Sequence, residues 1–222
     1  NLLKITIKDK SKIVASKSFV PGSGQIYQIY IKDVKTWSPK DPFLYDIIYE
    51  LILSNGITID RIQTYAGMRK IHTEGNKFFL NNEPFYQRLV LDQGFYPEGI
   101  WTAPNDEALK NDIKLGMSAG FNGARLHQKV FEERYHYWAD KLGYITWGEA
   151  ASWGMDANNP IAARNFISEW TEVVERDKNH PSIVIWTPFN ESVFTLEEKE
   201  RFDPELRKQH DRMVIDVYDL TK

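Results

Sequence analysis

The sequence predicts a chain of two parts: a partial antiparallel β-sandwich over residues 1–67, then the first four βα units of a TIM (β/α)8 barrel over residues 68–222. Three observations support this fold class. Apolar and polar residues alternate in the first part, as in half-buried strands. In the second part, helical periods alternate with short, nearly continuous apolar runs. The second part is also too short to close a barrel.

Strand-like segments separated by turns make up the first part. Alternation over 2–8 is typical of a strand with one buried face, and a second strand is expected over 26–31. Two further strands, 45–53 and 57–65, flank the hairpin signal Asn55-Gly56. Because no helical segment interrupts them, we expect a sandwich, and its small size suggests that it lacks one or more of its first strands.

Strands and helices alternate after Gly67. A short hairpin turning at Asn81-Asn82 precedes them, and Asn105 is the expected N-cap of the first helix. Strands are predicted over 87–91, 121–126, 144–147 and 182–189, and helices over 105–120, 131–142, 166–174 and 206–218. No Gly-rich phosphate loop follows the first strand, which disfavours a nucleotide-binding sheet. A complete barrel needs about 250 residues and only about 155 follow Gly67, so we expect half a barrel.

Bulk composition excludes several classes of function. The net charge is −3 and basic residues are scattered among acidic ones, so neither a nucleic-acid surface nor an anionic-membrane surface is predicted. The chain has no cysteine, which excludes disulfides and thiolate metal sites, and no apolar run long enough to span a membrane. We expect no metal and no cofactor. The sequence leaves localisation open.

Polar groups follow all four predicted parallel strands. They are Asp92 after the first strand, Arg125 and His127 at the second, Trp147 and Glu149 at the third, and Asn190-Glu191 after the fourth. Because the active sites of such barrels lie at the carboxyl ends of the strands, these groups are expected on one rim. Each has a structural alternative as well. Glu191 could be a solvated loop residue, Arg125 and Glu149 a structural ion pair, His127 a supporting residue, and Trp147 part of the barrel core.

Several motifs together resemble glycoside hydrolase family 2, which includes β-galactosidases, β-glucuronidases and β-mannosidases. The resemblance rests on Gly67–Ile71, Leu80–Pro84, Gly120–His127, Trp138–Tyr144, and Arg176–Trp186 followed by Asn190-Glu191-Ser192. It spans nearly the whole chain and implies that the first part is immunoglobulin-like.

The resemblance also implies roles for the residues on the rim. Glu191 would be the general acid/base, which protonates the glycosidic oxygen and then deprotonates water, and Asn190 would bind the sugar 2-hydroxyl. An apolar setting for Glu191, supplied by Trp186 and Phe189, would favour its protonated form. The remaining rim residues would orient carboxylates or bind sugar hydroxyls; they are Asp92, Arg125, His127, Trp147 and Glu149.

Departures from the family pattern limit what can be carried over. The residues after Arg125 are Leu126-His127-Gln128-Lys129, where familiar members have a Ser-His-Tyr-Pro-like tail, so the role of His127 is not carried over directly. Gly148 stands where many members have aspartate. The family's nucleophile lies after the seventh strand, and four units do not include it. We therefore expect a fragment of a retaining β-glycosidase that is inactive alone. The expected partners are a carbohydrate and, for the open half barrel, a second copy or the missing half.

Two alternatives stay open from the sequence. One is a carbohydrate-binding module that kept the rim and lost the chemistry. The other is an interaction domain, which would be favoured if Asn190 and Glu191 were buried in ion pairs.

Overall fold

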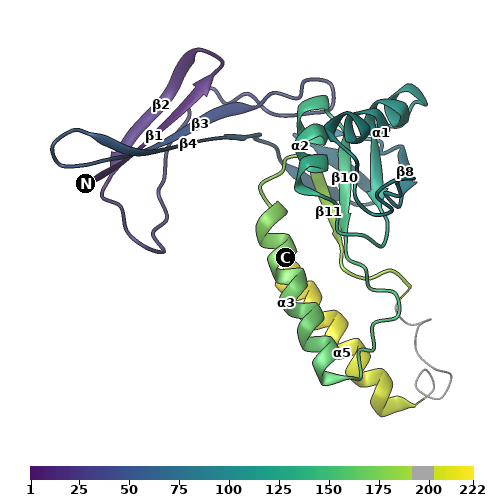
Figure 1. The fold of residues 1–222 in the computed structure, drawn as a ribbon. Helices are drawn as coiled ribbons and strands as arrows, with labels where there is room; N and C mark the ends of the chain where they lie inside the picture. The colour runs from purple at the N-terminus through teal and green to yellow at the C-terminus, as the bar shows by residue number, and fades with distance from the viewer. Residues whose placement is uncertain (192–202) are drawn as a thin grey trace. The chain divides into compact units, whose positions relative to one another are not determined.

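The structure is a computed structural model that describes residues 1–191 and 203–222. It divides into two compact units, residues 1–85 and residues 86–222. Each unit is described by itself below (Figure 1).

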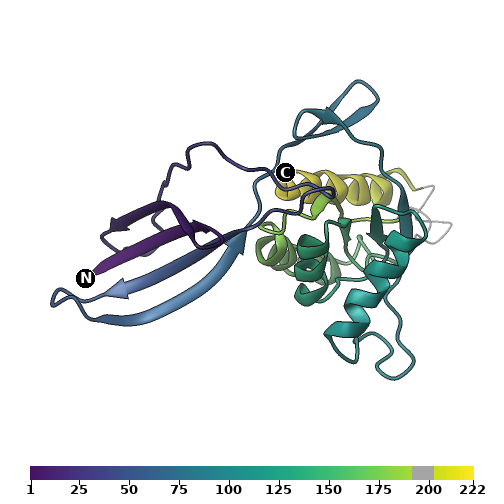
Figure 2. The same ribbon diagram turned by 90° about the horizontal axis from the view of Figure 1, so that it is seen from above.

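An antiparallel sheet forms the main part of the first unit. Its strands are β1 (Leu2–Asp9), β2 (Lys12–Phe19), β3 (Tyr45–Ile52) and β4 (Thr58–Ala66), in the order β2-β1-β3-β4 (Figure 2). The alternation seen in the sequence places Ile7 in the core, where it packs with Ile31 and Tyr45. The strands predicted over 2–8, 45–53 and 57–65 are confirmed.

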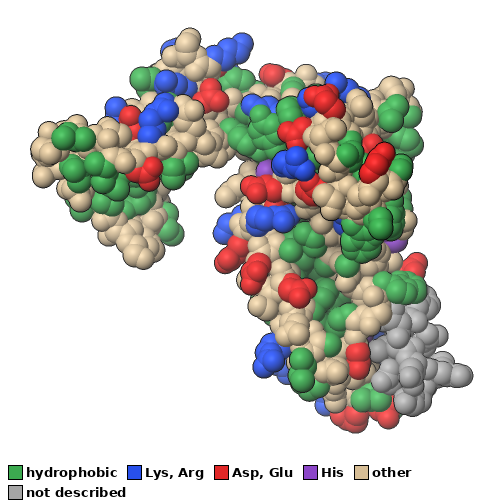
Figure 3. Space-filling model, viewed as in Figure 1, with side chains coloured by type: hydrophobic (Ala, Val, Ile, Leu, Met, Phe, Trp, Pro, Cys, Tyr) green, Lys and Arg blue, Asp and Glu red, His purple; other side chains and the backbone are tan. Residues whose placement is uncertain are grey.

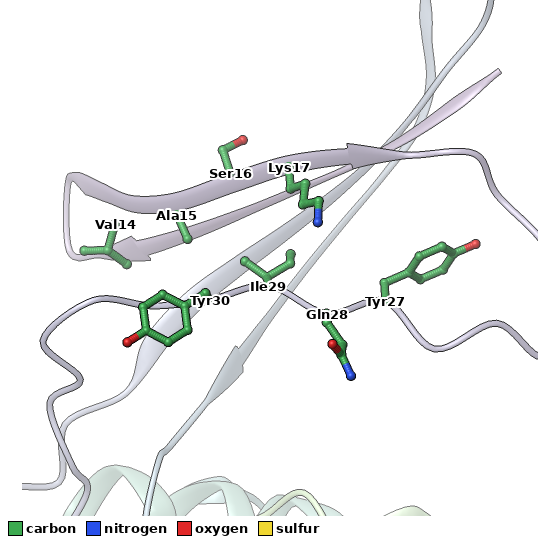
Figure 4. Close-up of a pocket in the computed structure, with 8 residues that line it drawn as sticks. All are labelled: Val14, Ala15, Ser16, Lys17, Tyr27, Gln28, Ile29 and Tyr30. Carbon is green, nitrogen blue, oxygen red and sulfur yellow. The ribbon is translucent and has the colours of Figure 1, made fainter.

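The strand predicted over 26–31 is not present as a strand. Residues 27–30 run beside the edge strand β2 without forming a ladder, and a groove of about 830 Å³ separates them (Figure 4). Ile29 points toward β2 and packs on the core, whereas Ile26 and Tyr30 are 90% and 87% exposed. The alternation therefore predicted a segment with one buried side chain among exposed ones. A strand also needs a hydrogen-bonding partner, which the described residues do not supply here. No carboxylate lines this groove, so it is not a candidate acid/base site.

A three-stranded hairpin sheet completes the first unit. It comprises β5 (Ile71–Glu74), β6 (Lys77–Leu80) and β7 (Glu83–Pro84), in the order β5-β6-β7. The predicted turn at Asn81-Asn82 is confirmed, with both residues at positive φ, which asparagine tolerates well. The Asn81 side chain accepts a hydrogen bond from Lys70 N and donates one to Trp37 O.

The second unit contains a parallel sheet whose order along the sheet is the order along the chain. Its strands are β8 (Leu89–Asp92), β9 (Gly123–Leu126), β10 (Ile145–Glu149) and β11 (Ile183–Thr187). Its helices are α1 (Asp106–Ser118), α2 (Glu133–Leu142), α3 (Pro160–Asp177) and α5 (Pro204–Thr221). The sequential parallel order confirms the prediction of the first four βα units of a barrel. Helices α3 and α5 lie side by side (Figures 1 and 2).

Capping and close packing explain why these elements begin and end where they do. Asn105 caps α1 as predicted, because its side chain accepts a hydrogen bond from Ala108 N at 3.0 Å. Gly143 ends α2 at φ 77°, the left-handed conformation that glycine adopts without strain. At Gly123 a Cβ would lie 2.3 Å from Ile145 O, so only glycine allows β9 and β10 to approach this closely.

Apolar side chains remain at the surface of both units, among charged ones (Figure 3). In the parallel sheet, β8 and β11 are the two end strands, and Leu91 on β8 is 55% exposed. Of the helices within residues 1–191 and 203–222, none is both long and apolar enough to cross a membrane.

Candidate active site at the carboxyl ends of the parallel strands

A hydrogen-bonded group joins three of the four strand ends. Arg125 on β9 donates from Nε to Glu149 Oε2 at 2.7 Å and from Nη2 to Glu149 Oε1 at 3.2 Å, and Glu149 is the last residue of β10. The same Nη2 donates to Asn190 Oδ1, past the end of β11, at 2.7 Å. The structure therefore brings Arg125, Glu149 and Asn190 together, as the rim prediction requires.

Glu149 is fully enclosed within this group. Its side chain is 0% exposed, and Oε1 also accepts a hydrogen bond from Gln128 N at 3.1 Å. A buried carboxylate needs such compensation, because burying an unpaired charge is costly. The contact between Arg125 and Glu149 is thus an ion pair, as one alternative from the sequence had it, and Arg125 still reaches Asn190.

Glu191 follows Asn190 and is exposed, with a backbone φ of 52°. Ser152 holds the turn that leads to it, since its buried Oγ accepts a hydrogen bond from Asn190 N at 3.0 Å. The rings of Trp186 and Phe189 pack toward α3, against Trp170 and Phe166. The apolar setting expected around Glu191 is therefore not supplied by these two rings.

The unusual Gly148 has a packing explanation. A Cβ at this position would lie 2.8 and 2.9 Å from two ring carbons of Trp186. Trp186 occupies the space beside β10 that a larger residue at 148 would need. The absence of a side chain at Gly148 therefore makes room for the Trp186 ring.

Asp92 and His127 have partners other than Arg125, Glu149 and Asn190. Asp92 Oδ1 accepts a hydrogen bond from Gly94 N at 2.8 Å, and Oδ2 accepts a longer one from Tyr135 at 3.4 Å. Burial raises the pKa of the Asp92 carboxyl. His127 Nδ1 lies 2.9 Å from the Gln93 amide nitrogen. Because an amide nitrogen only donates, Nδ1 is the acceptor in this contact.

The two tryptophans of the third strand and its loop differ in exposure. Trp147 is half-buried and donates from its ring nitrogen to Gln87 at 2.7 Å. Trp153 is 56% exposed, and its backbone N–H donates to Gln128 Oε1 at 3.0 Å.

The sequence reasoning missed Gln128 and Ser152, which support the rim, and Gln87, which precedes β8 and accepts a hydrogen bond from Trp147. Gln128 adopts φ 55° and binds both Glu149 and the backbone of Trp153. A signal existed for Gln128, because it directly follows His127 on a predicted rim segment. Nothing in the sequence marks Ser152, since a serine in a loop has many uses.

The first half of the motif 176–186 lies at the amino ends of the parallel strands, opposite the candidate site. His180 precedes β11, and its Nδ1 lies 2.6 Å from Asp140 Oδ2, while Asp140 Oδ1 accepts a hydrogen bond from Ser182 N at 2.9 Å. These groups are buried and join α2 to the start of β11. Within the part of the chain that the structure describes, no group of three or more acidic or histidine side chains could hold a metal ion.

Comparison with known proteins identifies the family. The model for glycosyl hydrolases family 2 matches residues 3–69, and the model for the TIM barrel domain of glycosyl hydrolases family 2 matches residues 71–215. A β-galactosidase of Pseudoalteromonas haloplanktis is 31% identical over 170 residues. A β-glucuronidase of Paenibacillus borealis is 27% identical over 191 residues.

Solved structures show the same fold. Bacteroides uniformis β-glucuronidase 2, covalently bound to cyclophellitol-6-carboxylate aziridine, superposes with a TM-score of 0.84 at 23% identity, over 100% of this chain and 28% of that one. For a Bifidobacterium dentium β-glucuronidase complexed with coumarin-3-O-glucuronide, the TM-score is 0.83 at 23% identity, over 99% of this chain and 35% of that one.

The chain spans only part of these relatives. The sequence match covers 73% of this chain but 16% of the Pseudoalteromonas protein, and 79% of this chain but 31% of the Paenibacillus protein. The barrel model alone matches more than half of this chain. The chain belongs to glycosyl hydrolases family 2.

Proposed function

We propose that this chain carries the acid/base part of the active site of a retaining glycosidase that hydrolyses O-glycosidic bonds of β-glycosides, with Glu191 as the acid/base. The observation that carries this proposal is the bond from Arg125 to Asn190. Because Arg125 holds the Asn190 amide oxygen, the amide nitrogen is the atom that can donate to a sugar hydroxyl. Glu191 follows directly and is exposed, so its carboxyl can reach a glycosidic oxygen.

Neither of the two neighbouring carboxylates is suited to act as the nucleophile. A retaining mechanism needs a second carboxylate about 5 Å from the acid/base, free to attack the sugar. Glu149 is 0% exposed and engaged by Arg125 and Gln128, while Asp92 is partly buried and bonded to Gly94. We therefore propose that the chain alone does not turn over β-glycosides and that the nucleophile belongs to the rest of a complete barrel.

The direct test is an assay with p-nitrophenyl β-D-galactoside and p-nitrophenyl β-D-glucuronide, chosen from the names of the relatives. No turnover is expected from this chain, whereas turnover abolished by Glu191→Gln would show that it carries a complete site. In a polypeptide that also carries four further βα units, Glu191→Gln should lower kcat by about 10²–10⁴-fold. The loss should be larger for alkyl than for p-nitrophenyl glycosides, because a poor leaving group needs more proton transfer.

A second candidate function is carbohydrate binding without hydrolysis. The engagement of Glu149 and Asp92 in internal hydrogen bonds favours it, since a binding site needs no free nucleophile. It would be preferred if the longer polypeptide bound β-glycosides and still gave no turnover.

A further inference from the structure

The loop that follows β8 presents two aromatic rings to solvent. Phe95 is 60% exposed and Trp101 is 49% exposed. Their ring centroids are 5.9 Å apart and the rings stand edge to face at 84°. Large apolar rings exposed as a pair are unusual on a surface and often mark a binding site.

A buried lysine fixes the backbone that carries these rings. Lys129 is 5% exposed, and its Nζ donates to Gly94 O at 2.8 Å and to Trp101 O at 2.7 Å. The ammonium therefore holds both ends of the loop, next to Phe95 and at Trp101 itself. It also lies 4.8 Å from the centroid of the Phe131 ring, which further compensates its charge.

The turn between the two rings is tightly constrained. Tyr96 and Ile100 exchange two backbone hydrogen bonds of 2.9 Å, and Ile100 adopts φ 56°, which is costly for a β-branched residue. At Gly99 a Cβ would lie 2.0 Å from the backbone oxygen of Thr102. Backbone strain of this kind persists only where the surroundings impose it, and it concentrates at functional sites. The backbone that carries the two rings is thus held in place before any ligand arrives.

A short path of hydrogen bonds and neighbouring residues links this loop to the candidate active site. Gln128 donates its backbone N–H to Glu149, and the next residue, Lys129, holds Trp101. On the other side, Phe95 lies only three residues after Asp92, the last residue of β8. The aromatic pair therefore lies at the same carboxyl edge as Asn190 and Glu191.

We propose that Phe95 and Trp101 form a sugar-binding subsite that stacks on a second sugar ring, next to the ring bound at Asn190 and Glu191. The proposal rests on the function proposed above and names the substrate class more narrowly: a β-glycoside with at least two sugar rings. A pyranose ring has an apolar face of C–H groups that fits the flat face of one aromatic ring, and the second ring, which stands edge to face at 84°, supports the first. A rigid backbone beneath them loses little conformational entropy on binding. Trp153 is the competing rim aromatic, but it stands on another loop and no second ring accompanies it among the described residues.

The test compares a one-ring and a two-ring ligand by isothermal titration calorimetry on this chain. The ligands are methyl β-D-galactoside and methyl β-lactoside, chosen because the relative at 31% identity is a β-galactosidase. The two-ring ligand should bind about tenfold more tightly, which corresponds to about 1.4 kcal/mol. Trp101→Ala should remove this advantage and leave the one-ring affinity unchanged, and Trp101→Phe should restore part of it. Equal affinity for both ligands, or no binding of methyl β-lactoside, would overturn the proposal.

Matched variants separate the possible failures. Gly99→Ala keeps both rings but displaces the turn, so it should also remove the two-ring advantage. Tyr218→Ala removes a ring that is 58% exposed near the end of α5, and it should change neither affinity. If Asn190→Ala weakens both ligands while Trp101→Ala weakens neither, the subsite is refuted and the proposed function stands. If Trp101→Ala acts and Asn190→Ala does not, the proposed function fails instead. An effect of Trp153→Ala in place of Trp101→Ala would assign the subsite to the other loop and refute this proposal.

Discussion

Removal of the Arg125 guanidinium should expose how strongly the rim depends on one ion pair. In Arg125→Met, Glu149 loses the bonds of 2.7 and 3.2 Å and keeps only the one from Gln128 N. The Glu149 side chain is 0% exposed, whereas the Arg125 side chain is 28% exposed, so water can replace only part of the lost interaction. Breaking a buried pair in this way costs about 3–5 kcal/mol, and the remaining bond places the expected loss near the lower end.

The free energy of unfolding can be measured by urea denaturation followed by tryptophan fluorescence. A loss of about 3 kcal/mol corresponds to a Tm lower by roughly 6–12 °C. Arg134→Met is the control, because Arg134 also forms ion pairs, with Asp106 and Glu132, but its side chain is 51% exposed. It should cost less than about 1 kcal/mol.

A second substitution tests the reason for the loss. If the cost comes from an unpaired buried charge, Arg125→Met combined with Glu149→Gln should recover most of the lost stability. The reasoning is refuted if Arg125→Met costs no more than Arg134→Met, or if the neutral glutamine brings no recovery.

Three further predictions follow from other parts of the second unit. Burial, together with the charge of His180, lowers the pKa of His136 to about 3 from 6.5. Between these two values the unfolded chain binds a proton that the folded chain does not. The free energy of unfolding should therefore fall by up to about 1.4 kcal/mol for each pH unit as the pH is lowered from 6.5 to 3. A His136→Gln variant with an unchanged slope in pH-dependent urea denaturation would contradict this. Gly148→Ala should cost about 1–3 kcal/mol and shift the tryptophan emission, because the new Cβ would meet Trp186 at 2.8 Å; equal stability would show that the ring moves freely. Light scattering should give a mass above the 25.9 kDa of one chain, because among the described residues the parallel sheet ends in two unclosed edges, β8 and β11, and Leu91 is exposed on β8; a monodisperse monomer would argue against association.

Local patterns in the sequence were enough to predict the order of strands and helices in the second unit. Helix periodicity and the caps at Asn105 and Gly143 depend on neighbours within a few residues, so they can be found without a structure. The same holds for the hairpin turn at Asn81-Asn82. The strand over 26–31 failed because alternation reports which side chains are buried, whereas a strand exists only when another segment completes its hydrogen bonds.

The candidate site, too, was predictable only in part from the sequence. The sequence by itself determined which residues follow the strands, and parallel strand order then places Asp92, Arg125, Glu149 and Asn190 at one edge. Only the tertiary structure decided how they are paired: Arg125 with Glu149 and Asn190, and Asp92 with its own loop. Such pairing depends on side chains up to 65 positions apart coming within hydrogen-bonding distance, 2.7 Å for Arg125 and Asn190, which no local pattern encodes. The loop anchored by Lys129 shows this most clearly, because a lysine expected at the surface is buried to hold two carbonyl groups that precede it by 28 and 35 positions.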